Sequence, residues 1–417
     1  MSTGRFSGSF GRIWAAAGLT SIGDGVTVAA IPLLATSITH DPQRVAFVTA
    51  AATAPFLLFG LIGGAFADRH DRKRILVLTD LMRMVLVLLL GVVCVFGAQN
   101  MWVLYLVAFG LGTGQCFFET SAQPVMLRVL DPENLHWGIG QLNIAEDTGR
   151  DFIGPPLGAW LFAGAMALPF FLDAASFVAS AVLIFSLKGS FNSTRDRSSE
   201  RSIRSDIGEA FRWLWGHVLL RDLALILAVW NIAVFAGHAI FVLYVLDDLH
   251  LTKEGYGVLL AYAALGALAA NFVAANVIKR IGEAGCLVMA ASVWVVTELV
   301  VAVTHSAVVA GTALSIAFGF LVIYGIVSIS IRQRCIPDEL FGRVNSMYRM
   351  AAWATDPLGA VLGGVLATHF GVRSVFFTSA AVSAVVALVL RWRITEARIA
   401  NSAVAVQDSS ASFTTDS

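Results

Sequence analysis

Charged side chains are scarce in this chain of 417 residues. Asp, Glu, Lys and Arg make up 13% of the sequence, against about 25% in an ordinary soluble domain. The formal net charge is zero. Because the chain has no excess of basic residues to attract phosphate groups, nucleic acid is excluded as a partner. Hydrophobic residues reach 57%, which excludes a disordered chain. The composition predicts a polytopic membrane protein embedded in the lipid bilayer.

The residue patterns of enzymes and cofactor proteins are also missing. The chain has only four cysteines, without the spacing of metal ligands or of a disulfide framework. It contains no G-x-x-x-x-G-K-[ST] loop for nucleotide phosphates. No Ser/His/Asp or Cys/His constellation converges at the ends of the apolar segments. We therefore expect no enzyme activity, no metal and no cofactor.

Long apolar stretches dominate the chain. A spanning helix needs about 20 mostly apolar residues, and twelve such stretches are present with short connections between them. The expected fold is an all-α polytopic membrane protein whose twelve transmembrane helices form two pseudo-symmetric six-helix halves. The expected spans are 13–38, 44–67, 75–98, 101–126, 139–163, 167–187, 223–246, 256–278, 285–303, 307–331, 344–368 and 374–390.

The longest polar stretch separates the sixth span from the seventh. This placement predicts an N-terminal half over 1–187 and a C-terminal half over 223–391, joined by a cytoplasmic linker over 188–222. A tail over 392–417, rich in Ser, Thr, Ala and Asp towards its end, is expected to be disordered and cytoplasmic.

Basic residues orient the bundle. With twelve spans both termini lie on one side, and 22 of the 28 Lys and Arg residues fall in segments on that side. The opposite loops hold only Arg44, Lys253 and Arg373. By the positive-inside rule, both termini are expected to be cytoplasmic in a bacterial-type plasma (inner) membrane.

The two halves carry matching motifs at a common offset. Leu135 and Leu340, each in a Pro-containing acidic segment, are 205 residues apart. The same offset pairs the D-x-x-G-x-x-L-G segments at 151–158 and 356–363, and a nearby offset pairs Asp24 with Asn231. Two parallel repeats related by an axis along the membrane normal are typical of transporters with a midplane site.

The loop after the second span carries a family signature. Gly64, Asp68, Arg69, Arg72 and Lys73 resemble the loop 2–3 motif of the major facilitator superfamily, G-x-x-x-D-R-x-G-R-K/R. Asp71 stands where glycine is usual. The resemblance implies a gate that latches the two halves on the cytoplasmic side. The alternative is that the basic residues only satisfy the positive-inside rule.

Two further segments narrow the resemblance. The amphipathic stretch 205–215 is similar to the linker helix of macrolide-efflux-type transporters. Gly154, Pro155 and Gly158 resemble the G-P-x-x-G-G element of antiporters, with Ala159 in place of the last glycine. The alternative for this element is a kink with close helix packing.

Ionisable residues within spans indicate coupling to protons. They cost about 2.5–3.5 kcal/mol each on insertion scales, so they usually have a partner or a function. Helical spacing places Arg150 near Glu146 and Asp147, with Asp151 beside it. We hypothesise that Asp151, with these three residues, couples proton entry to substrate exit, and further candidates are Asp24 and Asp356. A static network that fixes helix register is the alternative.

The resemblance also implies a substrate cavity, lined by the first, fifth, seventh and eleventh helices. Its candidate residues are Trp230, Asn231, His238, Tyr348, Arg349 and Trp353.

Three acids are expected outside the coupling site. Asp80 has the i,i+3 spacing of a structural pair with Arg83, Asp173 is expected as a cap or hinge, and Glu298 is expected to reach the interface.

The resemblance implies a secondary active transporter that exports an amphiphilic small molecule, such as a drug or antibiotic, in exchange for protons. The resemblance to the drug-exporting branch of the superfamily extends over nearly the whole chain. We expect the protein to be a monomer. Two alternatives stay open: a siderophore, lysophospholipid or nutrient transporter of the same fold, which could be a symporter, and a membrane enzyme or receptor.

Overall fold

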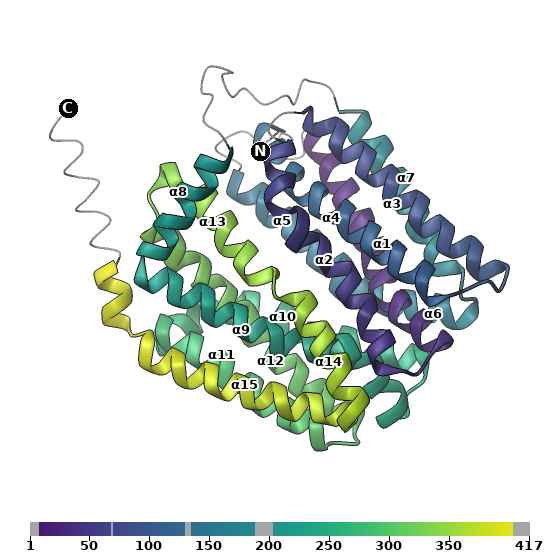
Figure 1. Cartoon of the computed structure of the whole chain (residues 1–417). Helices are drawn as coiled ribbons and strands as arrows, with labels where there is room; N and C mark the ends of the chain where they lie inside the picture. The colour runs from purple at the N-terminus through teal and green to yellow at the C-terminus, as the bar shows by residue number, and fades with distance from the viewer. Residues whose placement is uncertain (1–7, 68–69, 130–134, 188–202, 403–417) are drawn as a thin grey trace. The chain divides into compact units, whose positions relative to one another are not determined.

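A computed structural model describes residues 8–67, 70–129, 135–187 and 203–402. These residues form helices and contain no strand, which confirms the all-α fold class. The helices fall into two compact units. The first holds α1 to α7 together with residues 239–261, and the second holds α8, residues 218–238 and residues 262–402. Figure 1 shows the order of the helices along the chain.

The first unit begins with the helices of the first repeat. Their bounds are α1 Gly8–Ile38, α2 Pro42–Ala67, α3 Arg72–Val95, α4 Met101–Val129, α5 Leu135–Asp147, the π-helix η2 Thr148–Ile153, α6 Gly154–Gly164 and α7 Leu168–Phe185. The remaining elements are α8 Ile203–Gly216, α9 Val218–Leu243, the π-helix η3 Tyr244–Asp248, α10 Lys253–Ile281, α11 Glu283–Val303, α12 Ala307–Cys335, α13 Asp338–Trp353, α14 Asp356–Phe370 and α15 Val372–Arg393.

Eleven of the twelve expected spans coincide with helical segments of the described chain that are long and apolar enough to cross a membrane. The remaining one, expected at 139–163, is built from α5, η2 and α6. It is helical throughout, but four charged residues interrupt its apolar sequence. Pro155 has no N–H to donate to a helix hydrogen bond. The wider π turn lies directly before it, at the place where the regular α-helical pattern is interrupted.

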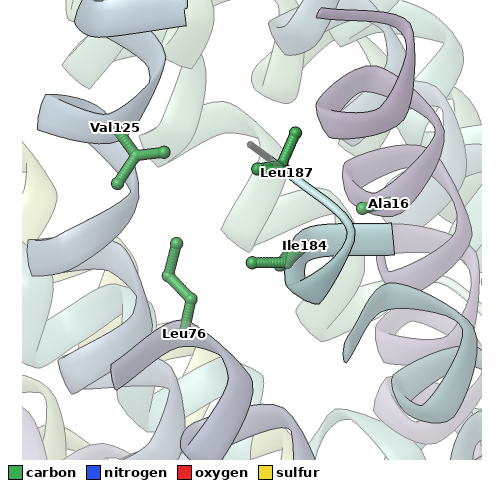
Figure 2. Packing of buried hydrophobic residues seen from close by; sticks show 5 residues of the cluster. All are labelled: Ala16, Leu76, Val125, Ile184 and Leu187. Carbon is green, nitrogen blue, oxygen red and sulfur yellow. The ribbon is translucent and has the colours of Figure 1, made fainter. Parts of the chain in front are cut away.

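The first unit is organised around α1. This helix contacts α6, α7, α5 and η2, while α3 packs between α4 and α7 and α2 packs on α4. Ala16, Leu76, Val125 and Ile184 bring α1, α3, α4 and α7 into one apolar cluster, which Leu187 closes just after α7 (Figure 2). The cluster anchors the four helices that also carry the buried polar network described below.

Close glycine contacts recur in both units. A Cβ on Gly158 of α6 would lie 2.8 Å from Val26 Cα of α1, and a Cβ on Gly363 of α14 would lie 2.7 Å from Ala236 Cα of α9. Real Cβ atoms do not approach so closely, so each crossing requires a residue without one. The two helix pairs occupy corresponding places in the repeats predicted from the 205-residue offset.

The linker and tail are partly helical. Helix α8 forms where the amphipathic stretch was predicted and packs on α13, with Arg343 Nη1 3.4 Å from Glu209 Oε2. Residues 188–202 lie outside the described chain. In the tail, α15 extends to Arg393 and residues 396–402 are helical rather than disordered, because Glu396 accepts a 2.8 Å hydrogen bond from Ala284 N on α11. Residues 403–417 lie outside the described chain.

We predict that alanine is not tolerated at the helix crossings. Gly158→Ala and Gly363→Ala should each lower the free energy of unfolding by about 1–3 kcal/mol, because the new methyl group overpacks the contact. The matched control is Gly325→Ala within α12, where a Cβ meets nothing within 4 Å. It should be neutral or stabilising by up to about 1 kcal/mol. Unfolding by detergent titration measures all three, and equal stabilities would contradict the packing argument.

Candidate functional site

Arg83 lies at the centre of a buried polar network in the first unit. It is 2% exposed, and its Nη2 donates a 2.9 Å hydrogen bond to Asp80 Oδ1 one turn earlier on α3. The other oxygen of Asp80 accepts a 2.7 Å hydrogen bond from Ser180 Oγ of α7. The predicted i,i+3 pair is therefore confirmed, and it ties α3 to α7 in the core.

The guanidinium of Arg83 also reaches two further helices. Nη1 lies 3.7 Å from Asp24 Oδ1 of α1 and donates a 2.6 Å hydrogen bond to Gln115 Oε1 of α4. The rings of Phe118 and Phe177 lie 4.7 and 4.6 Å from its central carbon. Aromatic faces favour a cation and exclude water, so electrostatic interactions here act in a low dielectric.

Asp173 of α7 adds another carboxylate to this network. The residue is 1% exposed, and it accepts hydrogen bonds from Thr27 Oγ1 of α1 and, at 3.2 Å, from Ser176 Oγ. It interacts electrostatically with Asp24 and Arg83. The expected role of Asp173 as a cap or hinge is wrong, because its carboxyl group faces α1. We call Asp24, Asp80, Arg83 and Asp173 the Arg83 network.

The Arg83 network has more acid than base. Asp80 and Asp24 lie within 4.0 Å of the guanidinium, and Asp173 adds a third carboxylate that interacts with Arg83 at longer range. Uncompensated charges are costly away from water. Such an arrangement favours a bound proton that the carboxylates share. Asp24 keeps 24% of its side chain exposed, against 2% for Arg83 and 0% for Asp80. Among these three side chains, Asp24 is therefore the most accessible.

The acidic cluster predicted around Arg150 is looser than expected. Asp147, Arg150 and Asp151 are exposed and Glu146 is partly buried. Electrostatic interactions join Arg150 to the three acids, but within the described residues no ion pair shorter than 4.0 Å does so. Helix spacing misled the prediction, because η2 begins at Thr148 and its π turns rotate Arg150 and Asp151 away from their α-helical directions.

Asp356 is buried in the second unit, at the first position of α14. It is 6% exposed, its Oδ1 has no hydrogen-bond partner among the described residues, and it interacts with the side chain of Asn231. Asn231 Nδ2 donates a 3.1 Å hydrogen bond to Ala352 O. The N-terminus of a helix favours a carboxylate. The contact between α9 and α14 thus brings Asn231 and Asp356 together.

Two candidate cavity residues are core residues instead. Trp230 is 1% exposed, with T-shaped contacts to Trp294 and Tyr324 at 6.2 and 5.2 Å. Tyr348 is also 1% exposed and its hydroxyl lies 3.3 Å from Ser328 Oγ. Their size and aromatic character suggested a cavity, whereas the structure uses both properties to fill the interior of the second unit.

The other cavity candidates are more accessible. His238 is exposed on α9 and contacts Phe235 with ring centroids 5.7 Å apart. Arg349 and Trp353 are partly exposed on α13, with the guanidinium 4.3 Å from the indole ring. These residues, together with Asn231, remain candidates for contact with substrate.

The predicted gating segment starts α3. Asp71, which departs from the usual glycine, caps this helix by accepting a 3.0 Å hydrogen bond from Lys73 N. Lys73 Nζ donates a 2.7 Å hydrogen bond to Leu187 O after α7. Arg72 is the first residue of α3 and Gly64 belongs to α2. Asp68 and Arg69 lie outside the described residues.

Gly154, Pro155 and Gly158 form a packing surface against α1. A Cβ on Gly154 would lie 2.5 Å from Gly25 Cα, so this position, like Gly158, requires a residue without a Cβ. Pro155 lies in the first turn of α6. These contacts favour the close-packing interpretation of the antiporter-like element.

Glu298 of α11 is an acid that sequence reasoning misplaced. It is 6% exposed, and its Oε1 accepts a 3.1 Å hydrogen bond from Ser379 Oγ of α15. No charged side chain of the described chain forms an ion pair with it. The contact between α11 and α15 brings the two residues together, and no motif in either helix indicates it. Within the same described residues, no cluster of His, Cys, Asp and Glu could hold a metal ion.

We predict strong coupling between Arg83 and Asp80. Arg83→Gln should lower the free energy of unfolding by about 3–5 kcal/mol, because it leaves Asp80 buried without a cation. Adding Asp80→Asn should recover at least about 1 kcal/mol of that loss. Detergent-induced unfolding of the two single variants and the double variant measures this coupling. Additive losses would show that the pair does not interact.

Glu298 should tolerate a neutral isostere. A buried carboxyl group without a cation is most stable when neutral, so Glu298→Gln should change the free energy of unfolding by less than about 1 kcal/mol. Ser379→Ala, which removes the hydroxyl donor, should lower it by about 1 kcal/mol. A loss above about 3 kcal/mol for Glu298→Gln in the same unfolding assay would instead require an ionised, paired carboxylate.

Comparisons with known proteins agree with this architecture. The Multidrug efflux pump Tap of Mycolicibacterium fortuitum is 28% identical over 371 residues, which cover 85% of this chain and 88% of Tap. The MFS-type transporter YfiS of Bacillus subtilis (strain 168) is 26% identical over 377 residues, 86% of each chain.

Solved structures share the fold at low sequence identity. The nucleoside transporter NupG superposes with a TM-score of 0.73 at 11% identity, covering 93% of this chain and 100% of NupG. An inward-facing bacterial homologue of the iron transporter ferroportin gives 0.74 at 16% identity, covering 93% and 99%.

The family assignment follows from nearly the whole sequence. The model of the family described as Transmembrane secretion effector matches residues 6–414. The residues that match include both repeats and the helices that carry the Arg83 network. The relatives and the family are membrane transporters and not enzymes. This chain belongs to the transmembrane secretion effector family of major facilitator transporters.

Proposed function

We propose that the protein is a secondary active transporter that exports an amphiphilic small molecule in exchange for protons by alternating access. The observation that carries the proposal is the Arg83 network, in which Asp80 (2.9 Å) and Asp24 (3.7 Å) share one buried guanidinium and Asp173 adds a third carboxylate nearby. A membrane interior disfavours an acid excess unless it serves a function. The similarity to a multidrug efflux pump supports a drug-like substrate and export.

Asp24 is the proposed entry point for the proton. When Asp24 is ionised, it helps to hold the guanidinium of Arg83 between α1, α3 and α4. Protonation removes that attraction and leaves Arg83 with Asp80, which Ser180 also holds. Asp173 and Thr27 lie on the adjoining contact of α1 with α7. A change in charge at Asp24 can therefore shift the packing of α1 without breaking the α3–α7 contact.

The remaining candidates have supporting roles in this proposal. Asp151, with Asp147, Arg150 and the partly buried Glu146, forms an acidic surface along α5 and η2, and Asp356 is a further protonation site in the second unit. The segment that begins α3 serves as the cytoplasmic gate. We further propose that the protein works as a monomer in the inner membrane, with both termini in the cytoplasm.

We predict that Asp24→Asn uncouples transport. Inverted membrane vesicles with a pH-sensitive dye and a panel of macrolides, cationic dyes and siderophores should show substrate-dependent proton flux for the unmodified protein. Asp24→Asn should lower that flux at least tenfold, because an amide cannot carry the proton, while exchange of substrate for substrate persists. The matched control, Asp151→Asn, makes the same change at an exposed carboxylate and should retain most of the flux.

The two variants separate the two acidic groups. Full gradient-driven transport by Asp24→Asn would remove the Arg83 network from the mechanism. Loss of flux in Asp151→Asn alone would assign coupling to the surface of α5 and η2. If a compound of the panel moves through the folded protein in the same direction as the proton, the protein is a symporter and the proposed exchange is wrong.

A further inference from the structure

A groove lies between α11 and α15, where α11 begins and α15 ends. The two helices pack side by side in the second unit (Figure 1). The groove has a volume of about 390 Å³, within the range of about 300–1,000 Å³ that is usual for ligand sites. Its walls are Ala284, Gly285, Val288, Met289 and Ser292 of α11, and Arg391 and Ile394 at the end of α15. Among these wall residues Arg391 alone carries a charge.

The groove continues into an exposed apolar surface along both helices. Met289 and Val296 lie on one face of α11 and are 38% and 61% exposed. On α15, Val385 and Leu388 are 60% and 48% exposed and share a face with Arg391. Both helices are long and apolar enough to cross a membrane. Acyl chains of the bilayer therefore cover this surface, and the groove opens at one end of it.

The neighbouring residues place this end at the boundary between lipid and water. Trp392, next to Arg391, is 74% exposed, and tryptophan is enriched at the level of the lipid headgroups. Lys279 and Arg280 end α10, and only Gly282 separates α10 from α11. These basic residues lie on the side that we propose to be cytoplasmic, where the membrane leaflet carries anionic lipids.

Arg391 has no partner within the described part of the chain. It is exposed, and it forms neither a hydrogen bond nor an ion pair there. The acids around it are already engaged. Glu283 forms an ion pair with Arg334, Glu396 accepts a hydrogen bond from the backbone of α11, and Asp222 has other arginines within 4.0 Å. The guanidinium of Arg391 is therefore available for an anion, and its planar fork suits a phosphate group.

We propose that this groove binds an anionic phospholipid, with the phosphate group on Arg391 and one acyl chain along Val288, Met289 and Ser292. The occupant matches both properties of the walls, which are one cation at the headgroup level and an apolar floor that leads to the lipid-facing surface. Basic pockets between transmembrane helices bind headgroups in this way. Phosphatidylcholine carries its own cation near the phosphate, so an anionic lipid gains more from the guanidinium. The bound lipid is independent of the compound that the protein transports.

The test is lipid binding by the purified full-length protein in detergent micelles, measured by native mass spectrometry. The protein is titrated with dioleoylphosphatidylglycerol, which is anionic, or with dioleoylphosphatidylcholine, which has no net charge. The unmodified protein should bind one phosphatidylglycerol molecule more tightly than phosphatidylcholine. Arg391→Gln should weaken binding of phosphatidylglycerol about fivefold or more and binding of phosphatidylcholine less than about twofold, because it removes one basic residue at the headgroup level.

Three further variants separate the headgroup from the acyl chain. Arg393→Gln is the matched control, since Arg393 lies outside the groove walls and pairs with Asp222, and it should leave both affinities unchanged. Arg391→Lys retains the charge and should keep part of the preference for phosphatidylglycerol. Ser292→Phe fills the apolar part of the groove and should weaken binding of both lipids while Arg391 is intact.

Four results would overturn the proposal. Two of them are equal affinity of the unmodified protein for the two lipids, and tight binding of phosphatidylglycerol by Ser292→Phe. Displacement of the lipid by glycerol 3-phosphate, which has no acyl chain, would assign Arg391 to a soluble anion. A dimer in the mass spectrum of the unmodified protein that is lost in Ser292→Phe would assign the groove to a second copy of this chain.

Discussion

The arrangement of the first unit depends on one constraint, which is that the charged guanidinium of Arg83 lies inside an apolar bundle of helices. Arg83 is 2% exposed, so its guanidinium must be held by groups from neighbouring helices rather than by water. Asp80, Asp24 and Gln115 meet this need from α3, α1 and α4, and Ser180 joins α7 through Asp80. This network holds four helices together. Because its carboxylates interact with one another and with Arg83, protonation of one carboxylate changes the balance of charge in the whole network.

The sequence predicts those features that depend on neighbouring residues along the chain. Apolar stretches of about 20 residues locate the spans, and the i,i+3 spacing alone indicates the Asp80–Arg83 pair. The 205-residue offset identifies the repeats, and Gly158 and Gly363 then make matching contacts with α1 and α9. These signals survive because helix geometry converts spacing along the chain directly into spacing in the structure.

Features that depend on contacts between distant helices escape such reasoning. Asp173 faces Thr27 across 146 residues and Glu298 faces Ser379 across 81, and neither pair has a local motif. The aromatic rings of Trp230 and Tyr348 suit a cavity and a core equally well by residue type. At η2 even the local rule fails, since a π turn changes the direction of Arg150 and Asp151 relative to Glu146.

Equivalent backbones need not keep equivalent polar groups. Gly154 and Gly359 pack against α1 and α9 in the same manner, yet Asp24 on α1 corresponds to Asn231 on α9. The amide of Asn231 carries no charge and donates to Ala352 O, whereas Asp24 faces Arg83. Close glycine packing fixes the geometry of each crossing without using the polar face of the helix. That face is therefore free to differ, so α1 can present the carboxylate of Asp24 where α9 presents the neutral amide of Asn231.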